Sequence, residues 1–197
     1  MLSGDWSSDV CSSDLEAGLF EELEEENKAA FEEYGVKEIV TLSPHCMNVL
    51  KKEYGDMGIK VVHYTELLAP LVEEGAIKLP GSFGKKVIYH DPCFLGKQNG
   101  VFDEPRAILG AVPDLELLEF SRSREMSLCC EGGGGRMFFE VEATYQRNAD
   151  VRVLDAVSRG AEIIATACPF CVMTLEDPAT EKGLAVKELS EILTEVL

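Results

Sequence analysis

Two adjacent cysteines, one glutamate and four glycines follow one another in the segment Ser127–Arg136, which reads SLCCEGGGGR. Neighbouring cysteines cannot form an unstrained disulfide with each other, and a run of glycines buries no side chains. A purely structural role therefore explains the segment poorly. Thiolates bind soft metals, and glycines let the backbone approach a bound group closely. We expect an iron–sulfur cluster to lie against this loop.

Three more cysteines follow the ends of two expected strands. Cys93 comes shortly after the apolar segment Lys86–His90, and Cys168 follows the segment Glu162–Ala167. Cys171 lies three residues further on, in the first turn of the next expected helix. A Cys-x-x-Cys turn between a strand and a helix points both sulfurs at one centre, where helix amides stabilise thiolate charge. These cysteines and the adjacent pair are expected to converge.

The number of thiolates favours one kind of metal. A structural zinc ion is satisfied by four ligands, so five thiolates are one too many. Iron–sulfur clusters use thiolate ligands, and several iron atoms can use adjacent cysteines. Glycines let backbone amides donate to sulfur, which tunes the reduction potential. The candidate site consists of five cysteines and three glycines: Cys93, Cys129, Cys130, Cys168, Cys171, Gly132, Gly133 and Gly134.

Parts of this set also suit other chemistry. The cysteines would suit a zinc-stabilised structural or docking module that uses four of them, and Cys168 with Cys171 would suit a dithiol redox protein. The glycine run would suit a phosphate, but no Gly-Lys-Ser/Thr follows it. The zinc module and the dithiol protein stay open as alternatives to the cluster.

Composition excludes some partners. The formal net charge is −18, from 18 Lys and Arg against 36 Asp and Glu, which opposes binding to nucleic acid or to an anionic membrane. No apolar run approaches the roughly 20 residues of a membrane-spanning helix, and no signal sequence is recognisable. We expect a cytoplasmic protein that meets the inner face of a membrane only through a partner or a missing N-terminal region.

Strand and helix patterns alternate, which predicts an α/β fold of tandem small domains, each with a largely parallel sheet flanked by helices. Residues 1–15 repeat Ser-Ser-Asp without any period and are expected to be non-native or disordered. Helices are expected at 16–34, from 44, and at 65–74, 104–109 and 137–159. Strands are expected at 38–42, 60–63, 86–90, 115–119 and 162–167.

The last part of the chain repeats the first. A shift of 125 residues places Gly35 on Gly160 and Cys46 on Cys171, without a gap over roughly forty residues. We infer a tandem duplication, with the C-terminal half of a first repeat at 16–80 and a complete repeat at 85–197. The first repeat is truncated and has Ser43 in place of a cysteine. The chain is therefore expected to be a C-terminal fragment that is not active alone.

The cysteine order resembles a known family. Cys93, 35 residues, Cys129-Cys130, 37 residues and Cys168-Pro-Phe-Cys171 resemble the cysteine-rich CCG domain of the heterodisulfide reductase catalytic subunit and its relatives. The His90–Gly96 segment is most similar to membrane-associated reductases linked to acyl-CoA dehydrogenase systems. The resemblance covers about residues 16–197.

The resemblance implies a [4Fe–4S] centre, of non-cubane type in heterodisulfide reductase, held by the same five cysteines. It also implies an electron-transfer part of an oxidoreductase complex. Electrons would pass between a flavoprotein or ferredoxin-type partner and a disulfide or quinone acceptor.

Four further residues carry expectations. Glu131 replaces the glycine that usually follows the cysteine pair, which matters if that position needs a positive φ. His45 is expected to cap a helix or to face solvent, with metal ligation as an alternative. His63 is expected to be structural. His90, at a strand end, is a candidate donor to a sulfur.

Overall fold

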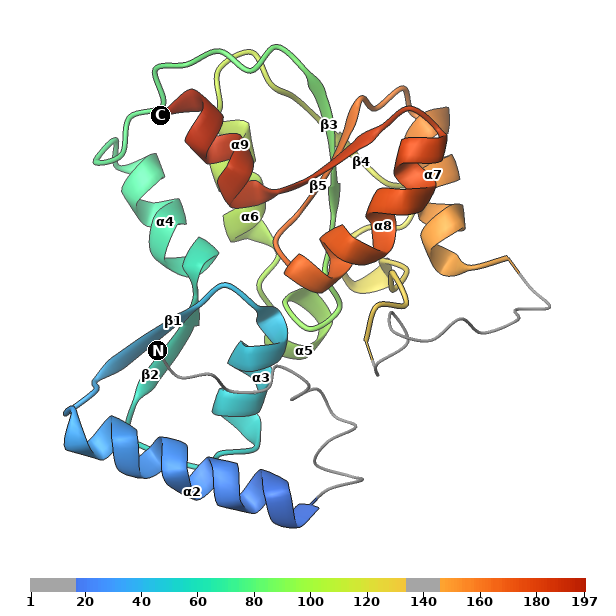
Figure 1. Ribbon diagram of the computed structural model, residues 1–197. Helices are drawn as coiled ribbons and strands as arrows, with labels where there is room; N and C mark the ends of the chain where they lie inside the picture. Colours follow the sequence, from blue (N-terminus) through green and yellow to red (C-terminus); the bar gives the residue numbers. More distant parts are fainter. Residues whose placement is uncertain (1–16, 134–145) are drawn as a thin grey trace.

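The computed structural model describes residues 17–133 and 146–197 and shows parallel strands alternating with helices (Figure 1). The elements are, in chain order, α2 (Ala17–Glu33), β1 (Glu38–Thr41), α3 (Pro44–Lys52), β2 (Lys60–His63), α4 (Tyr64–Glu73), β3 (Lys86–His90), α5 (Gly96–Asn99), α6 (Asp103–Gly110), β4 (Glu116–Glu119), the 3-10 turn η1 (Arg124–Met126), α7 (Asn148–Ser158), β5 (Ile163–Thr166), α8 (Pro169–Glu181), β6 (Ala185–Glu188) and α9 (Leu189–Val196). The predicted α/β class is confirmed.

The described strands form two parallel sheets. One contains β1 and β2, and the other has the strand order β4-β3-β5-β6. The central strand β3 pairs with both β4 and β5, so that Val87 lies opposite Leu117 on one side and Ile163 on the other. Helices α4, α6 and α9 lie on one side of the larger sheet, and α7 and α8 lie on the other (Figure 1).

Alternation along the central strands divides the core in two. Successive strand side chains point to opposite faces, so Val87 and Tyr89 join a cluster that also contains buried residues of α4, α6 and α9. Ile88 and Ile164 join a second cluster with residues of α7 and α8. Three cysteines lie in this second cluster, namely Cys130, Cys168 and Cys171. The candidate site is therefore part of the packed interior.

The internal repeat is visible in the order of the elements. β1, α3, β2 and α4 correspond to β5, α8, β6 and α9, and each counterpart begins 125 residues later, as in Glu38 and Ile163, Pro44 and Pro169, Lys60 and Ala185, and Tyr64 and Leu189. The strand register is also equivalent. His63 and Glu188 occupy equivalent N-cap positions, and each belongs to a capping box. The structural role predicted for His63 is confirmed.

One predicted helix is wrong in part. The first part of the expected helix over 137–159, residues 137–145, lies outside the described ranges, as do residues 1–15. Gln146 and Arg147 are not helical, and α7 begins at Asn148. Arg147 has a ψ of 144°, an extended conformation that a continuous helix could not contain. The helix ends before Gly160, which adopts a φ of +70°.

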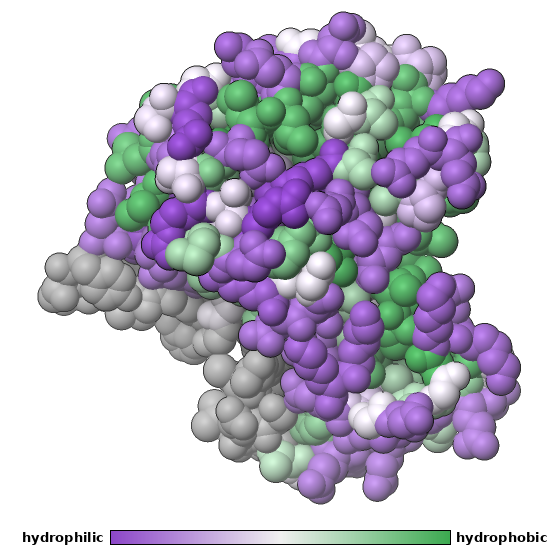
Figure 2. All heavy atoms as spheres, turned by 180° about the vertical axis from the view of Figure 1, so that it is seen from behind, coloured by the Kyte–Doolittle hydropathy of each residue, from purple (hydrophilic) through white to green (hydrophobic). Residues whose placement is uncertain are grey.

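Hydrophilic side chains cover much of the molecular face in Figure 2, with apolar patches between them. This distribution agrees with the 36 acidic residues of the chain. Among the helices of residues 17–133 and 146–197, none is long and apolar enough to cross a membrane.

Candidate metal centre

Three of the cysteines lie just after the ends of strands or at the start of a helix. β3 ends at His90, and Cys93 follows it after Asp91 and Pro92. Cys168 is the N-cap residue of α8, and Cys171 lies in the first turn of that helix. Because parallel strands end at one edge of the sheet, β3 and β5 bring both segments to the same place.

The structure brings all five predicted cysteines together in one chain of sulfur contacts. The Sγ atoms of Cys93 and Cys129 are 3.9 Å apart, and those of Cys130 and Cys171 are 3.3 Å apart. Thiol contacts also join Cys129 to Cys130 and Cys168 to Cys171. All five are free cysteines; Cys93 and Cys129 are half-buried and the other three are buried.

Of the three predicted glycines, Gly132 lies against a cysteine sulfur and Gly133 lies near His45. A Cβ atom on Gly132 would lie 2.4 Å from Thr174 Oγ1 and 3.4 Å from Cys130 Sγ, so any side chain there would have to displace the Thr174 hydroxyl. A Cβ atom on Gly133 would lie 3.8 Å from His45 Nε2, which is an ordinary contact. Gly134 lies outside the described residues. The steric requirement for glycine is thus strongest at Gly132.

Glu131 adopts the left-handed backbone conformation, with a φ of +68°. This position follows the cysteine pair, where glycine would adopt such a φ without steric cost. The conformation turns the Glu131 amide toward Cys129 Sγ, to which it donates at 3.3 Å. The loop therefore keeps the geometry of a glycine turn although the residue is a glutamate.

Strain at Glu131 can be measured by comparing two substitutions. Glu131→Gly and Glu131→Ala both remove the carboxylate, but glycine alone adopts a positive φ freely. We expect the glycine variant to be more stable than the alanine variant by about 1 kcal/mol. Anaerobic chemical denaturation of the metal-free proteins provides the measurement. Equal free energies of unfolding would mean that the backbone is not strained here.

Two of the five cysteines have a pKa that is lowered from its usual value. Hydrogen bonding from Cys130, followed by that from Cys93, lowers the pKa of Cys129 to about 2. Burial raises the pKa of Cys168, but hydrogen bonds involving Cys171 and His45 outweigh this effect and lower the pKa to about 5. Both residues therefore carry thiolates at neutral pH.

The other three thiols are held in the protonated form. Hydrogen bonding to the Cys129 thiolate raises the pKa of Cys130 to about 12 and also raises the pKa of Cys93. Hydrogen bonds to Cys130 and Cys168, with burial, raise the pKa of Cys171 well above its usual value. Each thiolate thus lies beside at least one protonated thiol, Cys129 beside Cys93 and Cys130, and Cys168 beside Cys171. Five thiolates would need a cationic centre among them.

The pH dependence of alkylation tests this pattern in the metal-free protein. Cys129 is expected to react at a rate independent of pH between about pH 5 and pH 8, because it is ionised throughout. Burial raises the pKa of half-buried Cys46, so its rate should increase about tenfold per pH unit. Mass spectrometry of the labelled peptides measures both rates. A parallel increase at the two cysteines would contradict the assigned thiolate.

His90 lies next to the sulfurs of Cys130 and Cys171 and is fully buried. One of its ring nitrogens lies within 4.8 Å of the sulfurs of Cys130 and Cys171. Its Nδ1 accepts a hydrogen bond of 3.1 Å from Arg152 Nε, and its Nε2 has no partner among the described residues. Burial, together with the charge of Arg152, lowers the pKa of His90 well below its usual value. The imidazole is therefore neutral.

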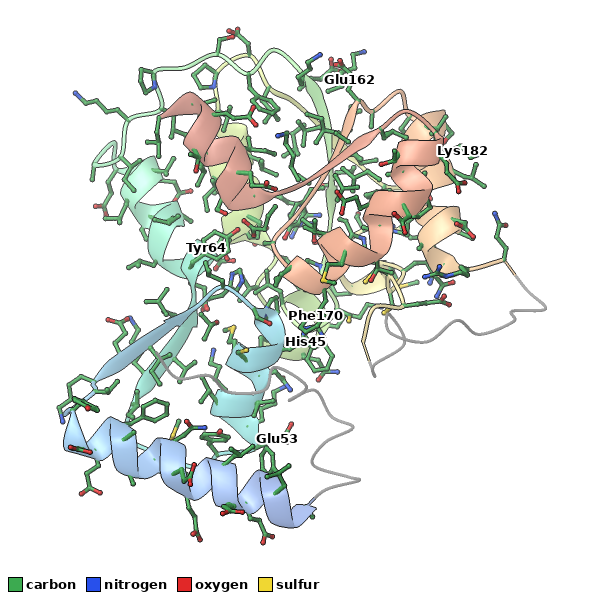
Figure 3. The ribbon with its side chains drawn as sticks, in the orientation of Figure 1. His45, Glu53, Tyr64, Glu162, Phe170 and Lys182 are labelled. Atoms are coloured by element: carbon green, nitrogen blue, oxygen red, sulfur yellow. The ribbon has the colours of Figure 1, made fainter. Side chains whose placement is uncertain are left out.

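The first repeat also reaches the cysteines, through His45. The expectation that His45 caps its helix or faces solvent is wrong, because Ser43 is the N-cap residue of α3 and His45 is buried. Its Nδ1 lies 4.0 Å from Cys168 Sγ. Its ring packs against the rings of Phe94 and Phe170, with centroid distances of 4.3 and 4.7 Å. Figure 3 shows His45 and Phe170 next to each other.

The internal repeat of the sequence relates the two residues of the contact between His45 and Phe170. The shift of 125 residues places His45 on Phe170, the second of the two residues between the cysteines of the Cys-x-x-Cys turn. The two equivalent helix starts therefore meet, and their equivalent aromatic rings pack against each other. Sequence reasoning aligned the two residues but did not predict that they touch.

Asp91, which sequence reasoning also missed, connects β3 to the loop before the cysteine pair. Its carboxylate accepts two hydrogen bonds from Arg106, at 2.7 and 2.9 Å, and one from the backbone amide of Arg124 at 2.8 Å. Its carbonyl accepts from Ser127 Oγ at 3.2 Å. Arg106 also pairs with Glu119 of β4. No short motif indicates this network, because Arg106 comes from a separate helix.

Comparison with known proteins gives one family. The model of a family described as "Cysteine-rich domain" (CCG) matches residues 9–51 and 87–176. The two matched segments correspond to the two halves of the chain that share the repeat.

Three relatives match most of this chain. It is 40% identical over 187 residues to the EtfAB:quinone oxidoreductase of Syntrophomonas wolfei, covering 89% of this chain and 26% of that protein. It is 41% identical over 166 residues to the "Probable iron-sulfur-binding oxidoreductase FadF" of Bacillus subtilis, and the match covers 83% of this chain and 23% of that protein. It is 32% identical over 183 residues to a subunit of the dihydromethanophenazine:CoB–CoM heterodisulfide reductase of Methanosarcina barkeri, and the match covers 89% of this chain and 44% of that protein. The chain thus spans about a quarter of the first two relatives.

Proposed function

Because the chain belongs to the family of cysteine-rich CCG domains, we propose that its clustered cysteines hold an iron–sulfur cluster that carries electrons within an oxidoreductase. The observation that carries the proposal is the unbroken line of sulfur contacts at the carboxyl edge of the larger sheet, formed by Cys93, Cys129, Cys130, Cys171 and Cys168. The names of relatives with an iron–sulfur, quinone or heterodisulfide oxidoreductase function support it.

The donor set fits a cluster in two ways. Two of the five adjoining cysteines carry thiolates and three are protonated, and iron atoms among them would allow all five to ionise. The loop at Gly132 packs against Cys130 without a side chain of its own, and the buried Nε2 of His90 lacks a partner among the described residues. Cluster sulfur would supply an acceptor for that buried group.

The chain itself would bind, shield and tune the group. A bound cluster supplies one-electron transfer at its iron atoms. The N-terminus of α8 and the Glu131 amide stabilise thiolate charge. Buried Cys168 and Cys171 exclude water from one side, whereas Cys93 and Cys129 are half-buried. We infer that the redox partner approaches from the side of Cys93 and Cys129.

The finer assignment is a [4Fe–4S] centre. Its partners would be a flavoprotein or ferredoxin-type donor and a disulfide or quinone acceptor. The quinone and heterodisulfide in the relatives' names support these acceptor classes. Contact with the inner face of the cytoplasmic membrane would then come from a partner or from another part of the complex. The domain boundaries at 16–80 and 85–197 are part of the same proposal.

Anaerobic reconstitution with iron and sulfide tests the proposed centre. We expect broad absorbance near about 400 nm and several iron atoms per chain. Elemental analysis of protein purified without added metal gives a second measurement. A colourless protein that retains one zinc ion and takes up no iron would overturn the cluster assignment.

A zinc-stabilised module is the second candidate, because the sulfur spacing favours it. Two thiolates on one tetrahedral zinc ion, each at a Zn–S distance of about 2.3 Å, would lie about 3.8 Å apart. The observed separations of 3.3 and 3.9 Å are close to this value. The fifth thiol and the named relatives favour iron. A dithiol enzyme is less favoured, because Cys168 is fully buried.

A further inference from the structure

β3 and α7 bring two buried side chains together next to the cysteine site. His90 ends β3, and Arg152 lies in the first half of α7, 62 residues further along the chain. Both are almost completely buried, with exposed fractions of 0% and 1%. A fully buried arginine is uncommon unless it is paired or hydrogen-bonded to a group that needs it.

The contact between them fixes the tautomer of His90. A guanidinium group has donors but no acceptor, so Arg152 Nε donates to His90 Nδ1 over their separation of 3.1 Å. Nδ1 therefore carries no proton, and the single proton of the neutral imidazole lies on Nε2. That N–H has no partner among the described residues, although Cys130 and Cys171 lie beside the ring.

Arg152 is held in place by contacts that do not neutralise it. Its Nη1 donates to the carbonyl of Arg122 at 2.8 Å, and its guanidinium carbon lies 3.5 Å from the ring centroid of Phe120. Within residues 17–133 and 146–197, no carboxylate lies within ion-pair distance of it, and its Nη2 has no partner. The charges of Asp91 and Asp155, and of Cys171 and Cys130 in the cysteine site, act on Arg152 from further away.

We propose that Arg152 is a positioning residue that fixes His90 as an Nε2–H donor to the sulfur atoms of the bound cluster, and that the pair raises the reduction potential of the cluster. The inference rests on the proposed function. Reduction adds negative charge, and both an N–H donor and a buried cation stabilise the more negative state. Removing either partner should therefore make the reduction potential more negative.

A redox titration followed by electron paramagnetic resonance tests the pair in the reconstituted chain. His90→Phe removes the donor and keeps an aromatic ring, and we expect a more negative midpoint potential. His90→Gln keeps an N–H donor and should return the potential toward that of the wild type. Arg152→Gln should also shift the potential to more negative values. The His90→Phe/Arg152→Gln double variant should shift it by less than the sum of the two single shifts.

A spectroscopic measurement separates positioning from general structural damage. In the wild type, an exchangeable proton on a histidine nitrogen should couple magnetically to the reduced cluster. The coupling should disappear in His90→Phe and persist in His63→Asn, which changes another fully buried histidine. His63 caps α4, and asparagine preserves a cap there.

The outcomes distinguish this inference from the proposed function. Failure of the wild-type chain to take up iron would overturn the proposed function. Iron uptake with equal potentials in the wild type, His90→Phe and Arg152→Gln, and with unchanged proton coupling in Arg152→Gln, would overturn the pair's role alone. Should His90→Phe bind no iron, Arg152→Gln still provides both measurements.

Discussion

Cys171→Ser is expected to remove almost all the iron that the reconstituted chain binds, whereas Cys46→Ser leaves the iron content unchanged. The two residues occupy equivalent positions of the repeat, each in the first turn of a helix that begins with proline. Only Cys171 belongs to the described line of sulfur contacts, at 3.3 Å from Cys130. A serine oxygen is a poor ligand for a cluster that uses soft thiolates.

This pair of variants controls for the substitution itself. Both replace a thiol by a hydroxyl at the third residue of a helix, so the effect on helix formation is matched. Iron per chain and visible absorbance provide the measurement, and circular dichroism checks the fold. Equal loss of iron in both variants would mean that the first repeat supplies a ligand. Full iron binding by Cys171→Ser would remove this cysteine from the proposed set.

The second large effect is expected from Arg106→Met, which leaves a buried carboxylate without its main partner. Asp91 is 3% exposed, and its carboxylate receives two hydrogen bonds from Arg106. Breaking a buried pair by removing one partner typically costs about 3–5 kcal/mol, because the remaining charge stays buried. The free energy of unfolding, measured by denaturant titration of the metal-free protein, should fall by about 3 kcal/mol.

Arg159→Met is the matched control for Arg106→Met. Arg159 forms an exposed ion pair with Asp155, over 3.1 Å and one turn of α7. Such surface pairs contribute only about 0.5 kcal/mol. The large cost should therefore be specific to Arg106. A loss below about 1 kcal/mol at Arg106 would show that solvent or Glu119 compensates Asp91 after the substitution.

The Asp91 network also links stability to the site. Asp91 accepts from the Arg124 amide and from Ser127 Oγ, and Ser127 comes two residues before Cys129. Loosening Asp91 should therefore displace the half of the site that the cysteine loop supplies. We expect Arg106→Met to bind iron more weakly than Arg159→Met even at temperatures where both are folded.

Much of the fold could be predicted from local patterns. The β-branched and apolar segments at β1, β3 and β5 formed strands at the expected residues, because alternation and flanking turn residues are local signals. Cys168 and Cys171 reached the strand-to-helix junction for the same reason. The start of α7 was placed too early, because apolar spacing does not exclude an extended residue such as Arg147.

The left-handed turn at Glu131 could be predicted only in part from the sequence. Its sequence position, directly after the cysteine pair, raised the question of a positive φ. Glutamate itself carries no preference for that conformation, and the φ of +68° is set by the surrounding loop. The amide bond to Cys129 Sγ is the contact that this conformation makes.

By itself, the sequence determined the types and spacing of the cysteines, the repeat of 125 residues and the parallel α/β class, because these depend on local order along the chain. The tertiary structure decided which distant side chains complete the site. His45 meets Cys168 across 123 residues, and Arg152 meets His90 across 62. Such contacts arise from how helices pack on the two sheets, and packing joins residues that no local pattern relates.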